Sequence, residues 1–344
     1  MRCVVVGAGV VGLAVAWGLR DRGLDVVVLE RTGIGAGASG VQPGGVRRQW
    51  GTRVACRLAS ESVGFWRDAT ERLESRVPLT LRRGGYLFVA QSEGTLGRLA
   101  ANVRLQNEEG VPSRIVAPEE AAELVPGLRA DTIAGGSWCG EDGYFDRPQA
   151  VVEAFARGLE VVQTEVRDVR ELAADAVVIA AGAETRGLVA PFGVDLPVVP
   201  EERFLYFSGP IGERLLEPLV VAPELAFAAK QLADGRVLTA DLRGDSRETI
   251  RAGIDALLPR LEYASLSLRV GGVYDVTPDH QPILGEVAEG VFVACGFSGH
   301  GFMIAPAVAR IIGDAVLGAR DEVLDVLGPD RFASGRLVPE PQLV

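Results

Sequence analysis

The sequence predicts an α/β protein of two discontinuous domains, in which a mostly antiparallel sheet-plus-helix domain is inserted into a unit of alternating strands and helices. Three observations predict this class. The chain opens with an apolar strand, glycine turn, helix and strand, a second glycine-rich strand-to-helix turn occupies 295–303, and short strands alternate with Gly and Pro turns over 203–242. The length of 344 residues suits two domains better than one core.

The N-terminal glycine turn has the G-x-G-x-x-G spacing, with Gly7, Gly9 and Gly12 between a buried strand and a helix. The first glycine permits the tight turn, the second lets the backbone approach a pyrophosphate, and the third lets helix and strand pack closely. Phosphates are favoured at the helix N-terminus. The second strand ends at Glu30, where a carboxylate can bind ribose hydroxyls. Together these features predict a Rossmann-type dinucleotide-binding unit.

The next elements follow from glycine content and periodicity. The glycine-rich stretch 31–51 predicts a loop that passes close to an extended ligand, with a flexible surface loop as the alternative. An apolar stripe at helical spacing predicts a helix over 53–75, and GGYLFVA predicts a strand. Helices are expected over 92–109 and 118–124, and a strand over 132–138.

In the second half of the chain, Pro148 marks the first turn of a helix. Residues 174–184 predict a buried strand that ends in small residues and Gly182. Ser246 is the expected N-cap of a helix that follows the short strands. The apolar run VFVA predicts the strand that leads into the second glycine turn, and a long apolar helix is expected after it.

Composition excludes several classes of partner. A net charge of −11 argues against nucleic acid or an anionic membrane as the main partner, although it leaves room for a small anionic substrate. We expect no membrane span, because no run is long and apolar enough. Four scattered cysteines without a CxxC motif predict reduced thiols in a cytoplasmic protein. Two histidines and no supporting carboxylate pattern predict no metal site.

In their order along nearly the whole chain, the motifs resemble those of the flavoproteins related to D-amino-acid oxidase (the DAO family), glycine oxidase and monomeric sarcosine oxidase. The resemblance rests on VVVGAGVVGLAVAWGL with VVVLE, GASGVQPGGVRRQWG, DAVVIAAGAE, VGGVYDVTPDHQPILGE and VFVACGFSGHGFMIAPAVARIIGDAVLG. It implies a Rossmann-type FAD-binding domain over 1–80, 141–200 and 272–344. The inserted substrate-binding domain would cover 81–140 and 201–271.

The resemblance implies that the first glycine turn holds the FAD pyrophosphate and the second meets the flavin ring. The N-terminus of the helix beginning near Gly301 would stabilise the negative charge of reduced flavin. Non-covalent FAD is expected, because Gly272 stands where sarcosine oxidases carry the cysteine of the covalent flavin link. The expected cofactor-binding residues are Gly7, Gly9, Val10, Val11, Gly12, Glu30, Arg31, Ser39, Gly40, Gly44, Gly45, Val166, Ala181, Gly182, Gly272, Gly296, Phe297, Gly299, His300, Gly301, Phe302 and Met303.

The activity implied is oxidation of the C–N bond of an amino acid or an N-substituted glycine. Hydride would pass from Cα to flavin N5, and water would hydrolyse the imine. O2 is the expected electron acceptor, giving hydrogen peroxide. One alternative is an FAD dehydrogenase of the same fold that passes electrons to a quinone or a partner subunit, and another is a flavin-binding assembly factor without turnover. The identity of the amine and the oligomeric state stay open.

The candidate anchor for a substrate carboxylate is Arg48, because a guanidinium pairs bidentately with a carboxylate. An interdomain ion pair is the alternative, and Arg47 is the second candidate. The usual family anchors are changed here: Met303 stands where sarcosine oxidases have a lysine, and Tyr274 stands near an arginine position of glycine oxidases. The expected catalytic residues are Arg48, Tyr274 and His300, and the expected substrate-binding residues are Arg47, Arg48, Trp50, Tyr274 and Met303. Packing or a structural hydrogen bond is the alternative for Trp50, Tyr274 and His300.

Lys230 is the only lysine among 35 basic residues. In sarcosine oxidases, a lysine from the substrate-side sheet promotes reaction with oxygen. The motif alignment does not bring Lys230 to that position, and we therefore expect Lys230 at the surface.

Overall fold

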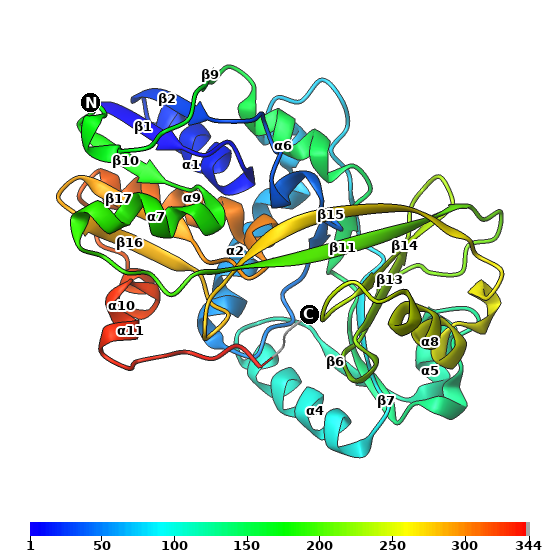
Figure 1. Ribbon diagram of the computed structural model, residues 1–344. Helices are drawn as coiled ribbons and strands as arrows, with labels where there is room; N and C mark the ends of the chain where they lie inside the picture. The colour runs from blue at the N-terminus through cyan, green and yellow to red at the C-terminus, as the bar shows by residue number, and fades with distance from the viewer. Residues whose placement is uncertain (342–344) are drawn as a thin grey trace.

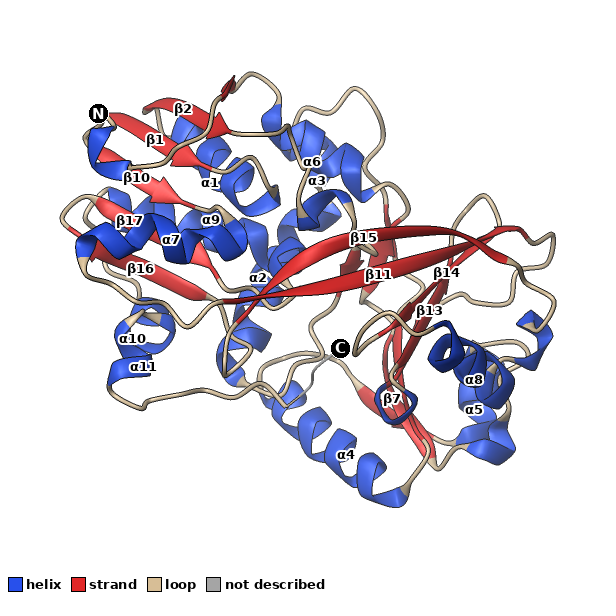
Figure 2. Ribbon diagram, in the orientation of Figure 1, coloured by secondary structure: helices blue, strands red, loops and turns tan. Residues whose placement is uncertain are grey.

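The computed structural model describes residues 1–341, which form three sheets with helices around them (Figures 1 and 2). The first sheet has six strands in the order β16-β17-β10-β1-β2-β9. Its strands are β1 (Arg2–Val6), β2 (Asp25–Glu30), β9 (Glu160–Gln163), β10 (Ala176–Ile179), β16 (Ile283–Ala288) and β17 (Val291–Cys295). The pairs β9-β2, β2-β1, β1-β10 and β10-β17 are parallel, and β16 joins β17 antiparallel.

Parallel strands with both faces covered by helices read as continuous apolar runs, as in the buried residues of β1. Helices α1 (Val10–Asp21) and α9 (Gly301–Val316) pack against each other beside this sheet (Figure 2). A Cβ atom at Gly12 would overlap the carbonyl oxygen of Gly7. The third glycine of the motif is therefore needed where α1 packs on the turn that precedes it.

The second sheet is mostly antiparallel and has the order β15-β11-β14-β13-β12-β5-β7-β6. Its strands are β5 (Tyr86–Ala90), β6 (Arg114–Val116), β7 (Gly135–Cys139), β11 (Val199–Pro210), β12 (Leu219–Ala222), β13 (Phe227–Gln231), β14 (Arg236–Asp241) and β15 (Leu266–Val276). Helices α4 (Glu93–Glu108), α5 (Pro118–Leu124) and α8 (Arg247–Leu257) accompany it. As expected, Ser246 caps α8, since its Oγ accepts from Thr249 N at 3.0 Å.

The two longest strands connect the two halves of the molecule. In Figure 1, β11 and β15 form a ribbon that crosses from the six-stranded sheet to the eight-stranded sheet. Their pairing runs from Val199 opposite Val276 to Ser208 opposite Leu266. The ribbon therefore spans the predicted boundaries at 200/201 and 271/272, while the six-stranded sheet is built wholly from segments assigned to the FAD domain. The domain limits stay a prediction.

A short third sheet, in the order β3-β8-β4, ties the loop after β2 to the middle of the chain. It contains β3 (Gly45–Val46), β4 (Leu81–Arg82) and β8 (Gly143–Phe145). The helix predicted over 53–75 is two helices, because the backbone leaves helical geometry at Asp68 between α2 (Arg53–Arg67) and α3 (Ala69–Arg72). The remaining helices are α6 (Pro148–Ala156), α7 (Thr185–Val189), α10 (Glu322–Leu327) and α11 (Asp330–Ala333). Within residues 1–341, no helix has the length and apolar character needed to cross a bilayer.

Candidate active site

A cleft of about 960 Å³ lies where the two glycine turns meet β15. Its volume is near the upper end of the roughly 300–1,000 Å³ typical of ligand sites. The predicted residues that line it are Gly7, Gly9, Val10, Val11, Glu30, Arg31, Ser39, Val166, Ala181, Gly182, Gly272, Tyr274, Phe297, Gly299, Gly301 and Phe302. Sequence reasoning missed other lining residues, among them Gln42 and Asp275.

The first end of the cleft lies at the N-terminus of α1. The Oγ of Ser39 accepts from Val10 N at 2.9 Å, so the loop after β2 folds over this turn. A Cβ atom at Gly9 would lie 3.2 Å from that hydroxyl, which leaves little room for a side chain. The helix dipole favours negative charge at such an N-terminus.

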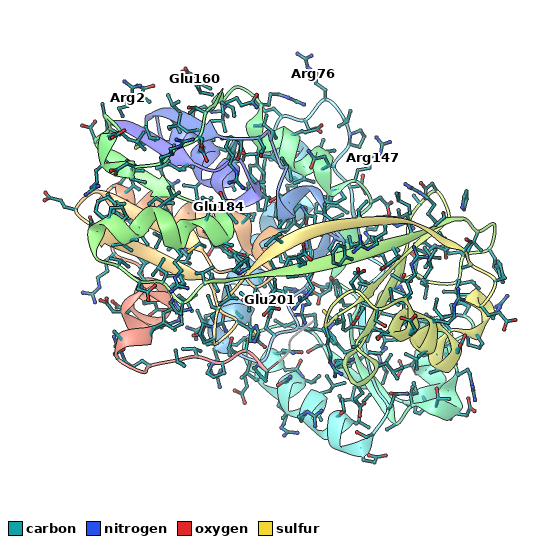
Figure 3. All side chains as sticks on the ribbon, viewed as in Figure 1. Arg2, Arg76, Arg147, Glu160, Glu184 and Glu201 are labelled. Carbon is teal, nitrogen blue, oxygen red and sulfur yellow. The ribbon has the colours of Figure 1, made fainter. Side chains whose placement is uncertain are left out.

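The carboxylate of Glu30 stands at the end of β2, beside this turn. It accepts from Ala8 N, Thr32 N and Thr32 Oγ1, each at 2.8 Å. Burial alone would raise the pKa of Glu30, but these hydrogen bonds hold it below its usual value. A charged acceptor is thus held ready for hydroxyl donors. At the rim, Arg31 pairs with Glu184. Glu184, which is labelled in Figure 3, immediately precedes α7.

The second end of the cleft is the turn between β17 and α9. Asp275 on β15 orders this turn, because its Oδ2 accepts from Gly296 N at 2.7 Å and its backbone O accepts from Ser298 N at 2.9 Å. Burial raises the pKa of Asp275 to about 6. Gly299 has φ +87° and lies against the ring of Tyr274, so that a Cβ there would come within 2.7 Å of Cδ2. The N-terminus of α9 consequently opens onto the cleft.

One cleft thus presents the N-terminus of α1, the carboxylate of Glu30 and the N-terminus of α9. The family model described as FAD dependent oxidoreductase matches residues 2–315. This chain belongs to that family. The resemblance to D-amino-acid oxidase-like flavoproteins is therefore confirmed, and the cofactor is FAD.

Relatives within the family act on amino acids. Glycine oxidase of Geobacillus kaustophilus is 27% identical, and the match covers 91% of this chain and 92% of the relative. The beta subunit of sarcosine oxidase from Rhodobacter capsulatus is 25% identical, with 98% and 90% covered. The crystal structure of L-proline dehydrogenase from P. horikoshii superposes with a TM-score of 0.91 at 26% identity, and the match covers 98% of this chain and 99% of that one.

Arg48 forms an ion pair with two carboxylates, and all three residues lie in segments assigned to the FAD domain, so the pair is not the interdomain one that was the alternative to a substrate anchor. Its Nη2 lies 2.8 Å from Glu141 Oε2, its Nε lies 3.4 Å from Asp142 Oδ1, and its backbone N donates to Asp142 Oδ2 at 3.0 Å. The Asp142 side chain is fully buried, and Arg48 does not line the cleft. A guanidinium bound to two carboxylates is poorly placed to bind a third.

The neighbouring Arg47 is the cation inside an aromatic cluster. It is fully buried, with Cζ 4.0 Å from the ring centre of Trp50 and 4.9 Å from that of Phe88, and its Nη1 donates to Gln49 O at 3.1 Å. Burial lowers the pKa of Arg47 to about 10, which still leaves it charged at neutral pH. The nearby Tyr86 and Phe88 could have been found from their alternation in the strand YLFVA.

His300 connects this cluster to the cleft. It lies between two lining residues at the start of α9, and its ring meets that of Trp50 edge-on at 4.6 Å between centres. Burial, with the added charge of Arg47, holds the pKa of His300 well below its usual value. His300 is therefore neutral at physiological pH.

The other predicted residues outside the lining pack around it. Met303 and Gly45 lie together, with Met303 Cε 3.5 Å from the position of a Cβ on Gly45. The predicted residues that do not line the cleft are Gly12, Gly40, Gly44, Gly45, Gly296, His300, Met303, Arg47, Arg48 and Trp50. Gly272 lies against the loop that follows β2. A Cβ atom built on Gly272 would be 3.3 Å from the Cβ of Val41.

The prediction of a surface position for Lys230 is wrong, because its side chain is 1% exposed. Sequence reasoning could not see that its partners are backbone carbonyl groups, which leave no mark in a sequence. Among residues 1–341, no group of three or more His, Cys, Asp and Glu side chains could hold a metal ion.

Proposed function

We propose that this flavoprotein oxidises the C–N bond of an amino acid or an N-substituted glycine, with O2 as the electron acceptor. Bound FAD would supply the hydride acceptor for the substrate Cα–H. The chain would position the substrate and exclude water. Gly9, Ser39 and Glu30 would hold the dinucleotide half of FAD, and the turn 296–301 would hold the flavin half.

The observation that carries the proposal is the buried cation Arg47, which packs on Trp50, whose ring in turn meets that of His300 between two lining residues of the cleft. A buried carboxylate without a positive partner is very costly, so an amino acid needs such a group beside the reacting carbon. Arg47, whose guanidinium packs against the rings of Trp50 and Phe88, would supply it. We accordingly transfer the role of carboxylate anchor from Arg48 to Arg47.

The surroundings of Arg47 also suit the amine. The amine must be uncharged, because its lone pair assists loss of hydride. The rings of Trp50 and Phe88 and a neutral His300 disfavour an ammonium ion next to the cationic Arg47. Tyr274, which lines the cleft, would offer a neutral hydrogen bond to the substrate.

The test is anaerobic reduction of the flavin by glycine, N-alkyl glycines, N-carboxymethyl amino acids, D-amino acids and proline, each compared with the amine that lacks its carboxylate. Arg47→Met should lower the second-order rate constant for the best acid by about 10²-fold or more, and far less for its amine analogue. The matched control is Arg203→Met, because Arg203 lies near Tyr274 but is already paired with Glu201. The proposal fails if no acid exceeds its amine analogue, or if Arg203→Met loses as much.

A dehydrogenase that reduces a quinone or a partner subunit is the second candidate. The similarity to L-proline dehydrogenase of P. horikoshii over nearly the full length of both chains favours it. Mixing the reduced protein with air separates the two. Rapid return of the yellow colour with formation of hydrogen peroxide supports the oxidase, whereas slow return in air and fast return with a quinone analogue supports the dehydrogenase.

A further inference from the structure

Lys230 is a buried amine at a junction of three chain segments. It projects from β13 of the eight-stranded sheet, and its Nζ donates to Phe145 O of β8 at 3.2 Å and to Pro43 O. The same Nζ lies 4.4 Å from the ring centre of Tyr144. The hydroxyl of Tyr144 donates in turn to Gln231 O at 2.9 Å, so β8 and β13 bind each other twice.

Pro43 belongs to the loop that folds over the phosphate end of the cleft. The preceding residue, Gln42, lines the cleft, and its Nε2 donates to Ser39 O at 2.9 Å. Ser39 accepts from Val10 N, the first residue of α1, at 2.9 Å. Three hydrogen bonds, joined by the short segment 39–43, therefore connect Lys230 to the N-terminus of α1.

The residues that follow Pro43 are also bonded to β8. Gly44 O accepts from Phe145 N at 2.8 Å, and Gly45 pairs with Tyr144 in the short sheet. The loop is thus fixed at its C-terminal end to β8, and Lys230 is the side chain that connects both to the inserted sheet.

We propose that Lys230 is a positioning residue for the cofactor. It ties the loop at Pro43 to β8 and to the inserted sheet, and thereby keeps Gln42 and Ser39 at the phosphate turn. This role concerns the binding of FAD, so it is independent of the substrate and of the electron acceptor proposed above.

The geometry explains why this one position is lysine when the other 34 basic residues are arginine. An ammonium group offers donors around a single point and fits between two carbonyl oxygens over an aromatic ring, whereas a guanidinium is a wide planar fork. Burial lowers the pKa of Lys230 to about 7, against the attraction of Asp146. Because a neutral amine still has two N–H donors, both carbonyl groups are satisfied with or without the extra proton.

The test is Lys230→Met, which keeps the length of the side chain and removes the donors. The readouts are the dissociation constant of FAD from the apoprotein, hydrogen exchange of peptides covering 33–46, and the melting temperature of the apoprotein. We expect the constant to rise by about tenfold or more, with faster exchange confined to the loop. The control is Thr239→Val, a buried residue on β14 that contacts Tyr206 and not the loop, and it should change the constant by less than about twofold.

Three results would overturn the proposal. The first is an unchanged dissociation constant with unchanged exchange in the loop. The second is an unchanged constant with slower reoxidation by O2, which would assign Lys230 to oxygen chemistry. The third is faster exchange over the whole inserted sheet with a lowered melting temperature, which would assign it to general stability. If Lys230→Met does not fold, the second variant is Lys230→Gln, which keeps one amide donor group. It should bind FAD with a dissociation constant between those expected for the wild type and for Lys230→Met. Wild-type affinity of Lys230→Gln for FAD would equally contradict the proposal.

Discussion

The position of Arg48 leads to a prediction about stability. The variant is Arg48→Met, which removes the guanidinium beside Asp142 while keeping most of the side-chain volume. Asp142 is fully buried, and after the change its carboxylate keeps the backbone N–H of residue 48 but loses its cationic partner. Removing one partner of a buried ion pair costs about 3–5 kcal/mol. The half-exposed Glu141 adds less than about 1 kcal/mol, because solvent screens that pair.

The assay is urea unfolding of the apoprotein, followed by circular dichroism and tryptophan fluorescence. Arg48→Met should lose about 3–5 kcal/mol of the free energy of unfolding, and Arg48→Met with Asp142→Asn should regain about half or more of it, because a neutral amide is cheaper to bury. A loss below about 1 kcal/mol would refute the reasoning. So would a normal stability combined with a large fall in the rate of flavin reduction by an acid, because that result would restore Arg48 as the substrate anchor.

The pH dependence of the same variant has a definite sign. Burial raises the pKa of Asp142 in the folded protein even with Arg48 beside it. A carboxylic acid with a raised folded pKa binds protons more readily folded than unfolded, so its contribution to stability falls as pH rises through that window. Loss of Arg48 raises this pKa further. The stability difference between wild type and Arg48→Met should therefore shrink when the pH is lowered from about 8 to about 5.

Three further predictions concern the cofactor and the pocket. Acid precipitation should release the FAD and leave the protein colourless, because Gly272 offers no thiol for a covalent link, and colour retained in the pellet would contradict this. Glu30→Ala should raise the dissociation constant of FAD by roughly ten- to hundredfold, corresponding to about 1.5–3 kcal/mol for hydrogen bonds that the charged carboxylate accepts, and an unchanged constant would place Glu30 away from the ribose. His300→Asn should leave the inflections of the pH profile of flavin reduction between about pH 6 and 9 where they are, since burial and Arg47 keep His300 neutral throughout that range, and loss of an inflection would show that His300 titrates.

The parts of the fold that sequence predicts best are those fixed by local rules. The spacing of Gly7, Gly9 and Gly12 and the apolar run of β1 depend on neighbours within 30 residues, and the structure has the predicted strand, turn, helix and strand there. The same holds for the cap at Ser246 and the start of α6 at Pro148. Each of these signals arises from backbone geometry that only certain residues adopt.

Long-range pairing limits what can be predicted. The ribbon of β11 and β15 pairs residues up to 77 positions apart, such as Val199 with Val276, and no local pattern requires the strands to continue across a domain boundary. Lys230 is a similar case. Its burial depends on the carbonyl groups of Pro43 and Phe145, which lie 187 and 85 residues away. A lysine is ordinarily expected at the surface, and only the folded structure shows that two buried carbonyl groups require a hydrogen-bond donor at this position.

Arg47 and Arg48 are adjacent residues whose different surroundings could not be predicted from the sequence. Both follow β3 in an extended segment, where consecutive side chains point to opposite sides. The sequence therefore indicates that one arginine faces each way, but which one meets substrate depends on where the opposing carboxylate lies. That carboxylate is Asp142, which lies 94 residues from Arg48 in the sequence and immediately precedes β8. Asp142 lies beside Arg48 because β8 pairs with β3. With Arg48 bound to Asp142, Arg47 packs against Trp50 and Phe88, and the choice between the two arginines therefore depends on a contact that lies far away in the sequence.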